Sequence, residues 1–234
     1  MSKLYLVPTP VGNLGDMTFR GVEVLRQADV VVAEDTRSAR RLLDHFGIEK
    51  KLFSFHKDNE HRMVGPLLER LRGGEVLALT SEAGTPGISD PGFLLVRACI
   101  EEGIDVEALP GATAFVPALV ASGLPCDRFF FEGFLPTKKG RNKRLTSLIP
   151  LPHTLVLYES PHRILRTLDD LAYHLGEKRR AAVAKEISKI HETIFRGTLG
   201  ELAEQLRSMP GKPKGEYVII VEGAPKETMS QSGN

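Results

Sequence analysis

The sequence predicts an α/β protein made of two domains. Short apolar runs alternate with segments of helical periodicity, and this alternation is typical of βαβ units around a mostly parallel sheet. The chain of 234 residues has room for two domains of roughly 110 residues each. Gly123-Leu124-Pro125 interrupts the pattern. We therefore expect domains at residues 1–122 and 123–223, followed by a disordered tail at 224–234.

The first domain is predicted to alternate strictly between strands and helices. Thr18 is a candidate cap for the first helix, Gly47 for the end of the second, and Gly73-Gly74 for the end of the third. Asp90 before Pro91 could cap the fourth. The expected strands are residues 4–7, 29–33, 52–55, 75–79 and 105–109, and the expected helices are 18–28, 38–46, 58–71, 91–102 and 112–121.

The second domain is predicted to contain a mixed sheet. Residues 181–186 and 191–198 both have strand character, and no helix fits between them, so they should pair antiparallel. The other expected strands are 128–132, 154–158 and 217–222, and the expected helices are 161–175 and 199–209.

Composition excludes several classes of protein. Cys99 and Cys126, the only two cysteines, form no metal-binding pattern, which predicts a protein without metal in a reducing cytosol. No apolar run approaches the roughly 18 residues that span a membrane. The formal net charge is only +1, so any nucleic-acid site must be a local basic patch.

Four loops follow strands and are rich in Gly, Pro and small polar residues. Ligands of open α/β sheets bind at the carboxyl ends of strands, so these loops are candidates for a binding site. Each also has a structural interpretation, as a plain turn, a helix cap or close helix–sheet packing. None contains a dinucleotide-binding or P-loop motif. The loops are residues 8–16, 33–37, 80–92 and 110–114.

Together the loops resemble the tetrapyrrole-methylase family, and within it the branch that methylates ribosomal RNA. The resemblance extends over residues 3 to 223. Its motifs in the first half are Leu-Tyr-Leu-Val-Pro-Thr-Pro-Val-Gly-Asn-Leu-Gly-Asp, Ala-Glu-Asp-Thr-Arg and Ala-Gly-Thr-Pro-Gly-Ile-Ser-Asp-Pro-Gly. In the second half they are Glu132-Gly133-Phe134-Leu135-Pro136, Tyr158-Glu159-Ser160-Pro161-His162-Arg163, Ala184-Lys185-Glu186-Ile187 and Lys214-Gly215-Glu216. Glu82 departs from the family's usual Asp, so its contacts are in doubt.

The resemblance implies two α/β domains with S-adenosylmethionine (SAM) in the cleft between them. It also implies a homodimer and 2′-O-methylation of a cytidine ribose in the decoding region of small-subunit (16S) ribosomal RNA. The implied cofactor-binding residues are Pro8, Gly84, Thr85, Ile88, Thr113, Ala114, Tyr158, Glu186, Gly215 and Glu216.

A ribose hydroxyl is a weak nucleophile, so a base or a nearby cation would assist its attack. Lys185, Glu186 and Lys189 are the candidate catalytic group, although they could equally form an ion-paired face. Five cations fall within residues 138–144 without an acid, which predicts either phosphate binding or a solvated loop. The candidate RNA-binding residues are Arg37, Lys138, Lys139, Arg141, Lys143, Arg144 and Arg163.

Two other functions remain open at this point. A methyltransferase acting on a corrin or porphyrin precursor would share the cofactor loops but has no evident use for the basic segment. An RNA-binding protein that has lost activity would keep that segment but not bind SAM. Measuring SAM affinity separates the last from the other two.

Overall fold

The computed structural model describes residues 2–225, so most of the expected tail lies outside the described residues. The chain divides into two compact units, one ending at Thr113 and the other beginning at Ala114. This division precedes the boundary that we expected. The reason is that helix α5 (Phe115–Ser122) packs on strands of the second sheet.

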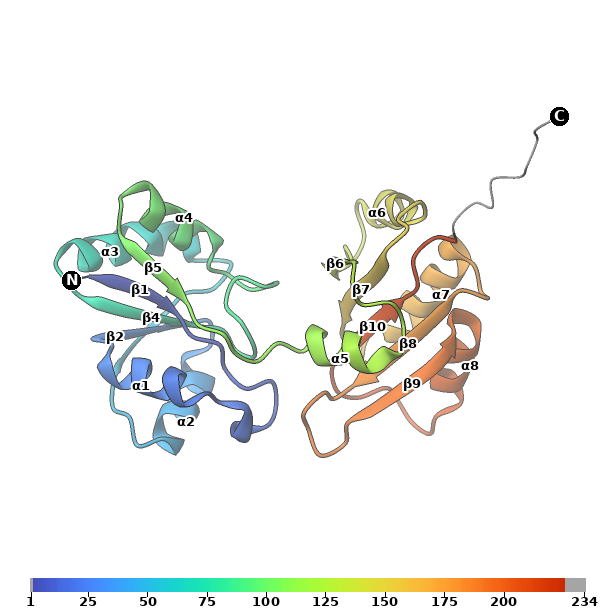
Figure 1. Cartoon of the computed structure of the whole chain (residues 1–234), viewed down its shortest axis with the longest axis horizontal. Coiled ribbons are helices and arrows are strands. Elements are labelled where there is room, and N and C mark those ends of the chain that lie inside the picture. The colour runs from blue at the N-terminus through green and yellow to red at the C-terminus, as the bar shows by residue number, and fades with distance from the viewer. Residues whose placement is uncertain (1, 226–234) are drawn as a thin grey trace. The chain divides into compact units, whose positions relative to one another are not determined.

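The first unit is a five-stranded parallel sheet with helices on both faces (Figure 1). The strand order is β3-β2-β4-β1-β5. Its strands are β1 (Lys3–Leu6), β2 (Val30–Ala33), β3 (Lys51–Ser54), β4 (Val76–Thr80) and β5 (Asp105–Ala108). Its helices are α1 (Phe19–Gln27), α2 (Thr36–His45), α3 (Glu60–Arg72) and α4 (Phe93–Glu101), with the short 3-10 helix η1 (Leu14–Asp16) before α1.

Two apolar clusters fix the layers of the first unit. Leu25 of α1 and Leu43 of α2 pack with Val31 on one face of the sheet. Leu71 of α3 and Leu95 of α4 pack on the other face. The helix caps follow the expected chemistry at α1, where the Thr18 hydroxyl accepts a hydrogen bond from the Gly21 N–H. The predicted parallel α/β arrangement of this unit is confirmed.

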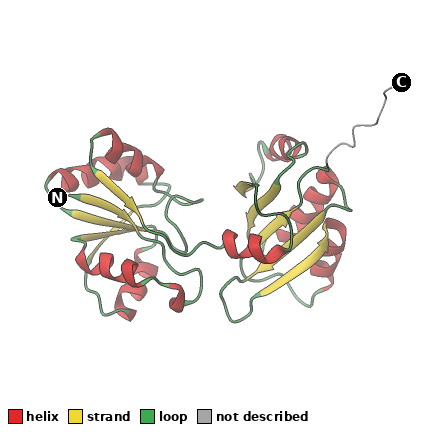
Figure 2. Ribbon diagram, in the orientation of Figure 1, coloured by secondary structure: helices red, strands yellow, loops and turns green. Residues whose placement is uncertain are grey.

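The second unit is a five-stranded mixed sheet with the order β6-β7-β10-β8-β9. Figure 2 shows helices on both of its faces. The expected antiparallel pair is β8–β9, so the predicted mixed sheet is confirmed. Its strands are β6 (Phe129–Phe134), β7 (Thr154–Glu159), β8 (Arg180–Lys185), β9 (Thr193–Thr198) and β10 (Tyr217–Val221). Besides α5, its helices are α6 (Arg141–Leu148), α7 (Ile164–Leu175) and α8 (Leu199–Ser208).

Helix α6 was not expected, because its sequence reads as a basic loop with few apolar residues. Leu145 and Leu148 nevertheless point into the core of the second unit. Arg141, at the first turn, is also buried, with only 3% of its surface exposed. Its guanidinium donates hydrogen bonds to Asp170 at 2.7 Å, Thr167 at 2.8 Å and the Pro136 carbonyl at 3.1 Å. These bonds fasten α6 to α7.

The first prediction concerns Arg141. Replacing it with Gln removes one partner of a buried ion pair, so the variant Arg141→Gln should lower the free energy of unfolding by about 3 kcal/mol. Urea denaturation followed by circular dichroism measures this change. Lys143→Gln, two residues away and exposed, is the control and should stay within about 0.5 kcal/mol of the wild type. Equal stability of the two variants would contradict the structural role of Arg141.

Candidate functional site

The loops of the first unit meet at one edge of its sheet, because all five strands run parallel and their carboxyl ends share that edge. Strand β4 lies between β1 and β2, so the loop after β1 and the loop after β4 are neighbours. Their backbones pair directly. The Thr9 N–H donates to the Gly84 carbonyl and the Gly84 N–H to the Thr9 carbonyl, both at 2.9 Å. Pro8, just before this bridge, is buried.

The turn at Gly84 contacts a third loop, the one after β5. The Thr85 hydroxyl donates a hydrogen bond to the Ala112 carbonyl at 3.0 Å. Gly84 has a φ of +87°, and a Cβ there would lie 3.4 Å from Val11 and 3.6 Å from the Ala112 oxygen. A glycine therefore lets three loops come together without a side chain between them. Thr113 follows in the same loop, and Ile88 lies exposed on the β4 loop.

Carboxylates gather at the same edge of the sheet. Glu34 follows β2, whereas Glu82 and Asp90 belong to the loop after β4. Burial raises the pKa of Glu34, and Glu82 adds repulsion. Burial also raises the pKa of Asp90, to about 7, with Glu34 as the next cause. Lys57, after β3, opposes both shifts. Three acids with one nearby cation form a site that favours positive charge.

The caps near this edge differ in part from the sequence-based expectation. Gly92, not Asp90, is the N-terminal cap of α4, so the predicted capping role of Asp90 is wrong. Asp35 does cap α2, accepting a hydrogen bond from the Arg37 N–H at 2.7 Å, and it also pairs with the Arg37 guanidinium. The site residues expected from the sequence do not include Asp90. The available signal was that its loop follows β4, the neighbour of β2 in the sheet, so that Asp90 shares one edge of the sheet with Glu34, which follows β2.

In the second unit, residues after β8 and before β10 form a compact charged latch, defined here as Glu186, Lys189, Gly215 and Glu216. Lys189 Nζ lies 2.8 Å from Glu186 Oε1 and 3.0 Å from Glu216 Oε2. The Glu216 N–H donates to Glu186 Oε1 at 2.9 Å. Glu186 has a φ of +55°, an uncommon conformation for a residue with a side chain. A Cβ on Gly215 would lie 2.5 Å from two Glu186 carbons, so only glycine fits.

The latch has a defined charge state. Burial acts to raise the pKa of Glu186, but the hydrogen bonds from Lys189 and the Glu216 backbone outweigh it, so the pKa is lowered. Burial acts to lower the pKa of Lys189, but its two carboxylate partners raise it overall. Glu186 is thus a weak base and Lys189 a persistent cation. Lys185 is the last residue of β8, beside this group.

Tyr158 lies at the same edge, near the end of β7. Its ring is 5.3 Å from that of Phe131 and 5.6 Å from that of Phe134. Register brings Tyr158 opposite Val218 of β10. In the second unit, Tyr158 and the charged latch therefore lie at the same edge of the sheet.

Ala114, the remaining expected cofactor contact, is the N-cap of α5.

The expected RNA-binding cations are not equivalent. Arg141 is a correction, because it is buried and bound to Asp170 rather than available to RNA. Arg144 pairs with Glu132 at 2.6 Å, and Arg163 pairs with the buried Glu159 at 2.8 Å. Arg37 is exposed but contacts Asp35. Lys138, Lys139 and Lys143 are exposed and make no ion pair within the described part of the chain.

Residues 2–225 contain no group of three or more His, Cys, Asp or Glu side chains that could hold a metal ion. The same residues contain no helix with the length and apolar character to cross a membrane.

The sequence is similar to those of known methyltransferases. Residues 3–203 match the family model described as Tetrapyrrole (Corrin/Porphyrin) Methylases. A protein of Haemophilus influenzae named Ribosomal RNA small subunit methyltransferase I is 51% identical over 95% of this chain and 79% of its own length. A Synechocystis protein of the same name is 50% identical over 97% of this chain and 81% of its own.

A solved structure shares the fold at lower identity. Uroporphyrin-III C-methyltransferase from Thermus thermophilus, complexed with S-adenosylhomocysteine, superposes with a TM-score of 0.65 at 22% identity. The match covers 94% of this chain and 97% of that one. The family model covers most of the sequence, and each of the two relatives is identical to this chain at about half of the aligned positions. The chain belongs to the tetrapyrrole (corrin/porphyrin) methylase family.

Proposed function

We propose that this chain is a SAM-dependent methyltransferase that modifies small-subunit (16S) ribosomal RNA, at the ribose 2′-oxygen of a cytidine in the decoding region. About half of the aligned residues are identical to those of relatives whose names include that RNA, and this identity supports the proposed substrate. The corrin or porphyrin alternative has weaker support, because the uroporphyrin enzyme shares only 22% of its residues. We further propose a cytoplasmic homodimer.

The strand-end loops of the first unit fit SAM. SAM carries a sulfonium and an ammonium, and the acids Glu34, Glu82 and Asp90 at this edge favour positive charge. The glycine turn at Gly84 exposes backbone to an approaching ligand. We propose that Pro8, Gly84, Thr85, Ile88 and Thr113 contact the cofactor from this unit. Ala114, Tyr158, Glu186, Gly215 and Glu216 are the proposed contacts from the other unit.

Methyl transfer requires that the ribose oxygen be aligned with the methyl carbon and that the developing alkoxide be stabilised. When bound, SAM would supply an electrophilic methyl carbon to the ribose oxygen, sulfur would keep the electron pair of the broken carbon–sulfur bond, and the hydroxyl proton would pass to solvent water. Alignment alone can provide on the order of 7–11 kcal/mol. Lys189, held in place by Glu186 and Glu216, is a cation that would stabilise the developing alkoxide. Lys185, Glu186 and Lys189 are the proposed catalytic group, with Glu186 positioning Lys189.

Methyl transfer to purified 30S particles that lack the modification tests the proposal. Radioactive methyl should pass from SAM to 16S rRNA and appear as a 2′-O-methylated nucleoside after digestion. Transfer to a porphyrin precursor but not to RNA would instead establish the alternative function.

The second prediction concerns Gly84. Gly84→Val adds a branched side chain where three loops meet, so SAM binding measured by calorimetry should weaken at least tenfold. Gly74→Val is the matched control, because Gly74 also has a positive φ of +96° but has open space around it and follows α3 at the opposite end of β4. Both variants share the backbone strain. Normal SAM affinity in Gly84→Val, or equal loss in both, would rule out the site.

The third prediction concerns pH. Asp90 has a pKa raised to about 7, so it is mostly protonated below pH 7 and ionised above it. A cationic ligand favours the ionised form, so SAM affinity should rise between pH 6 and pH 8. Calorimetry at both values measures the change. Asp90→Asn should bind SAM more weakly and lose this pH dependence. An unchanged profile in that variant would show that Asp90 does not face the cofactor.

The fourth prediction concerns the exposed lysines before and within α6. Replacing Lys138, Lys139 and Lys143 with Gln leaves the structural Arg141 and Arg144 in place. If these lysines bind phosphates, the slope of log affinity for rRNA against log salt should flatten by about 0.7–0.9 per lost contact. SAM affinity should not change. An unaltered slope would mean that this segment is only a solvated surface.

A further inference from the structure

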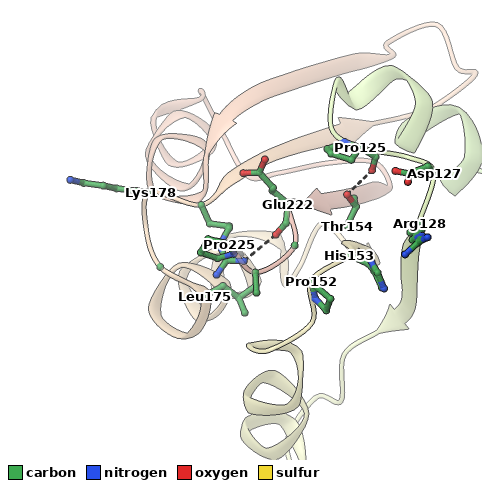
Figure 3. Close-up of a pocket in the computed structure, with 14 residues that line it drawn as sticks. Pro125, Asp127, Arg128, Pro152, His153, Thr154, Leu175, Lys178, Glu222 and Pro225 are labelled. Carbon is green, nitrogen blue, oxygen red and sulfur yellow. Dashed lines mark hydrogen bonds between the residues drawn. The ribbon is translucent and has the colours of Figure 1, made fainter. Parts of the chain in front are cut away.

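The second unit contains a groove at the edge of its sheet opposite the charged latch. It lies where β6, β7 and β8 begin and β10 ends, and its volume is about 1070 Å³ (Figure 3). Strand β7 runs from Thr154 at the groove to Glu159 at the edge that carries Tyr158. At about 3.3 Å per residue, the groove lies roughly 17–20 Å from that edge. It is therefore separate from the proposed methylation site.

Basic residues from three segments border this groove, and Figure 3 shows that the Lys178 side chain extends outward from it. Arg128 and His153 immediately precede Phe129 and Thr154, which are paired in the parallel β6–β7 ladder, so their backbones are neighbours. Lys178 and Arg179 come from the α7–β8 connection. Arg128, His153 and Lys178 make no hydrogen bond or ion pair within the part of the chain that the structure describes. Three cationic or ionisable groups are thus available to a ligand.

The acids of the groove do not cancel this charge. Glu222 is already engaged: its carboxylate lies 3.7 Å from Arg180, and its carbonyl accepts a hydrogen bond from Arg179 at 3.3 Å. Asp127 is the other acidic side chain in the lining. The lining therefore contains three permanent cations, Arg128, Lys178 and Arg179, against two acids. One of these acids, Glu222, is paired with Arg180, which lies outside the lining. A polyanion fits this balance better than a cation does.

Size and surface argue for an extended ligand. Small-molecule pockets are typically about 300–1,000 Å³ and mostly enclosed by apolar walls. This groove is slightly larger than that range, and its apolar residues, Pro152 and Leu175 among them, are interleaved with the charged ones. Such a mixture suits a chain of phosphates with sugars between them.

Helix α6 connects the two edges of the second unit. It follows β6, which ends beside Tyr158, and leads to Pro152 at the groove. Its eight residues span about 12 Å. Lys138, Lys139 and Lys143 lie at its beginning. Exposed cations therefore occur at both ends of the helix.

We propose that the groove binds the sugar–phosphate backbone of the RNA substrate at a distance from the methylated nucleotide. The inference rests on the proposed function and adds a second contact region to it. Arg128 and Lys178 supply positive charge to phosphates, and the His153 ring can form a hydrogen bond with a phosphate or a sugar hydroxyl.

The test compares two double variants of the full chain with equal change in charge. Arg128→Gln/Lys178→Gln removes the groove cations, whereas Lys51→Gln/Arg62→Gln removes exposed cations of the first unit. Binding to 16S rRNA is measured from 50 to 200 mM salt, together with SAM affinity and methylation kinetics. The groove variant should lose on the order of tenfold in RNA affinity, and its salt slope should fall by about 1.4–1.8. Its KM for RNA should rise with little change in kcat.

Each outcome has a distinct meaning. A groove variant that matches the control variant, while the wild type methylates rRNA, overturns the groove proposal and leaves the proposed function intact. A wild type that neither binds nor methylates rRNA overturns the proposed function itself.

Discussion

The pair of backbone hydrogen bonds between Thr9 and Gly84 is the constraint on which the first unit's site depends. Parallel strands place the loops that follow them at one edge of the sheet, but the strands do not connect those loops to one another. The bridge joins the loop after β1 to the loop after β4, and Thr85 extends the connection to the loop after β5. Three segments far apart in sequence are thereby held as one rigid surface, which a ligand-binding site requires.

In the second unit, the segments after β8 and before β10 are joined by ion pairs together with a backbone hydrogen bond, from the Glu186 N–H to the Glu216 carbonyl at 2.9 Å. Glu186 adopts an uncommon backbone conformation, and its carboxylate occupies the space that a side chain at Gly215 would fill. The ion pairs with Lys189 stabilise that arrangement. A separate network, in which the buried Glu159 accepts hydrogen bonds from Thr167 and Ser160 and pairs with Arg163, fixes the end of β7. Uncommon conformations persist when the surroundings hold them in this way.

Most strands and helices of this fold could be predicted from the sequence, because apolar periodicity and glycine or threonine caps are local signals. Helix α6 could not, since only Leu145 and Leu148 mark its buried side. The role of Arg141 also required the structure: five cations in seven residues are indistinguishable in sequence, yet one finds Asp170 across 29 positions and becomes part of the core. The raised pKa of Asp90 could not be predicted for a similar reason, because it comes from burial and then from Glu34, on the loop that follows a different strand.

The ion pairs distinguish the cations that stabilise the fold from the cations that could contact RNA. Of the cations near α6, Arg141 and Arg144 offset Asp170 and Glu132, so their positive charge serves the fold. The lysines beside them have no such partner within the described residues, and neither do Arg128 and Lys178 at the far edge of the sheet. A chain with a net charge of only +1 can therefore present local positive surfaces, while Glu34, Glu82 and Asp90 lie together at the strand-end loops of the first unit. Separation of charge, rather than total charge, would allow one protein to hold a cationic cofactor and an anionic polymer.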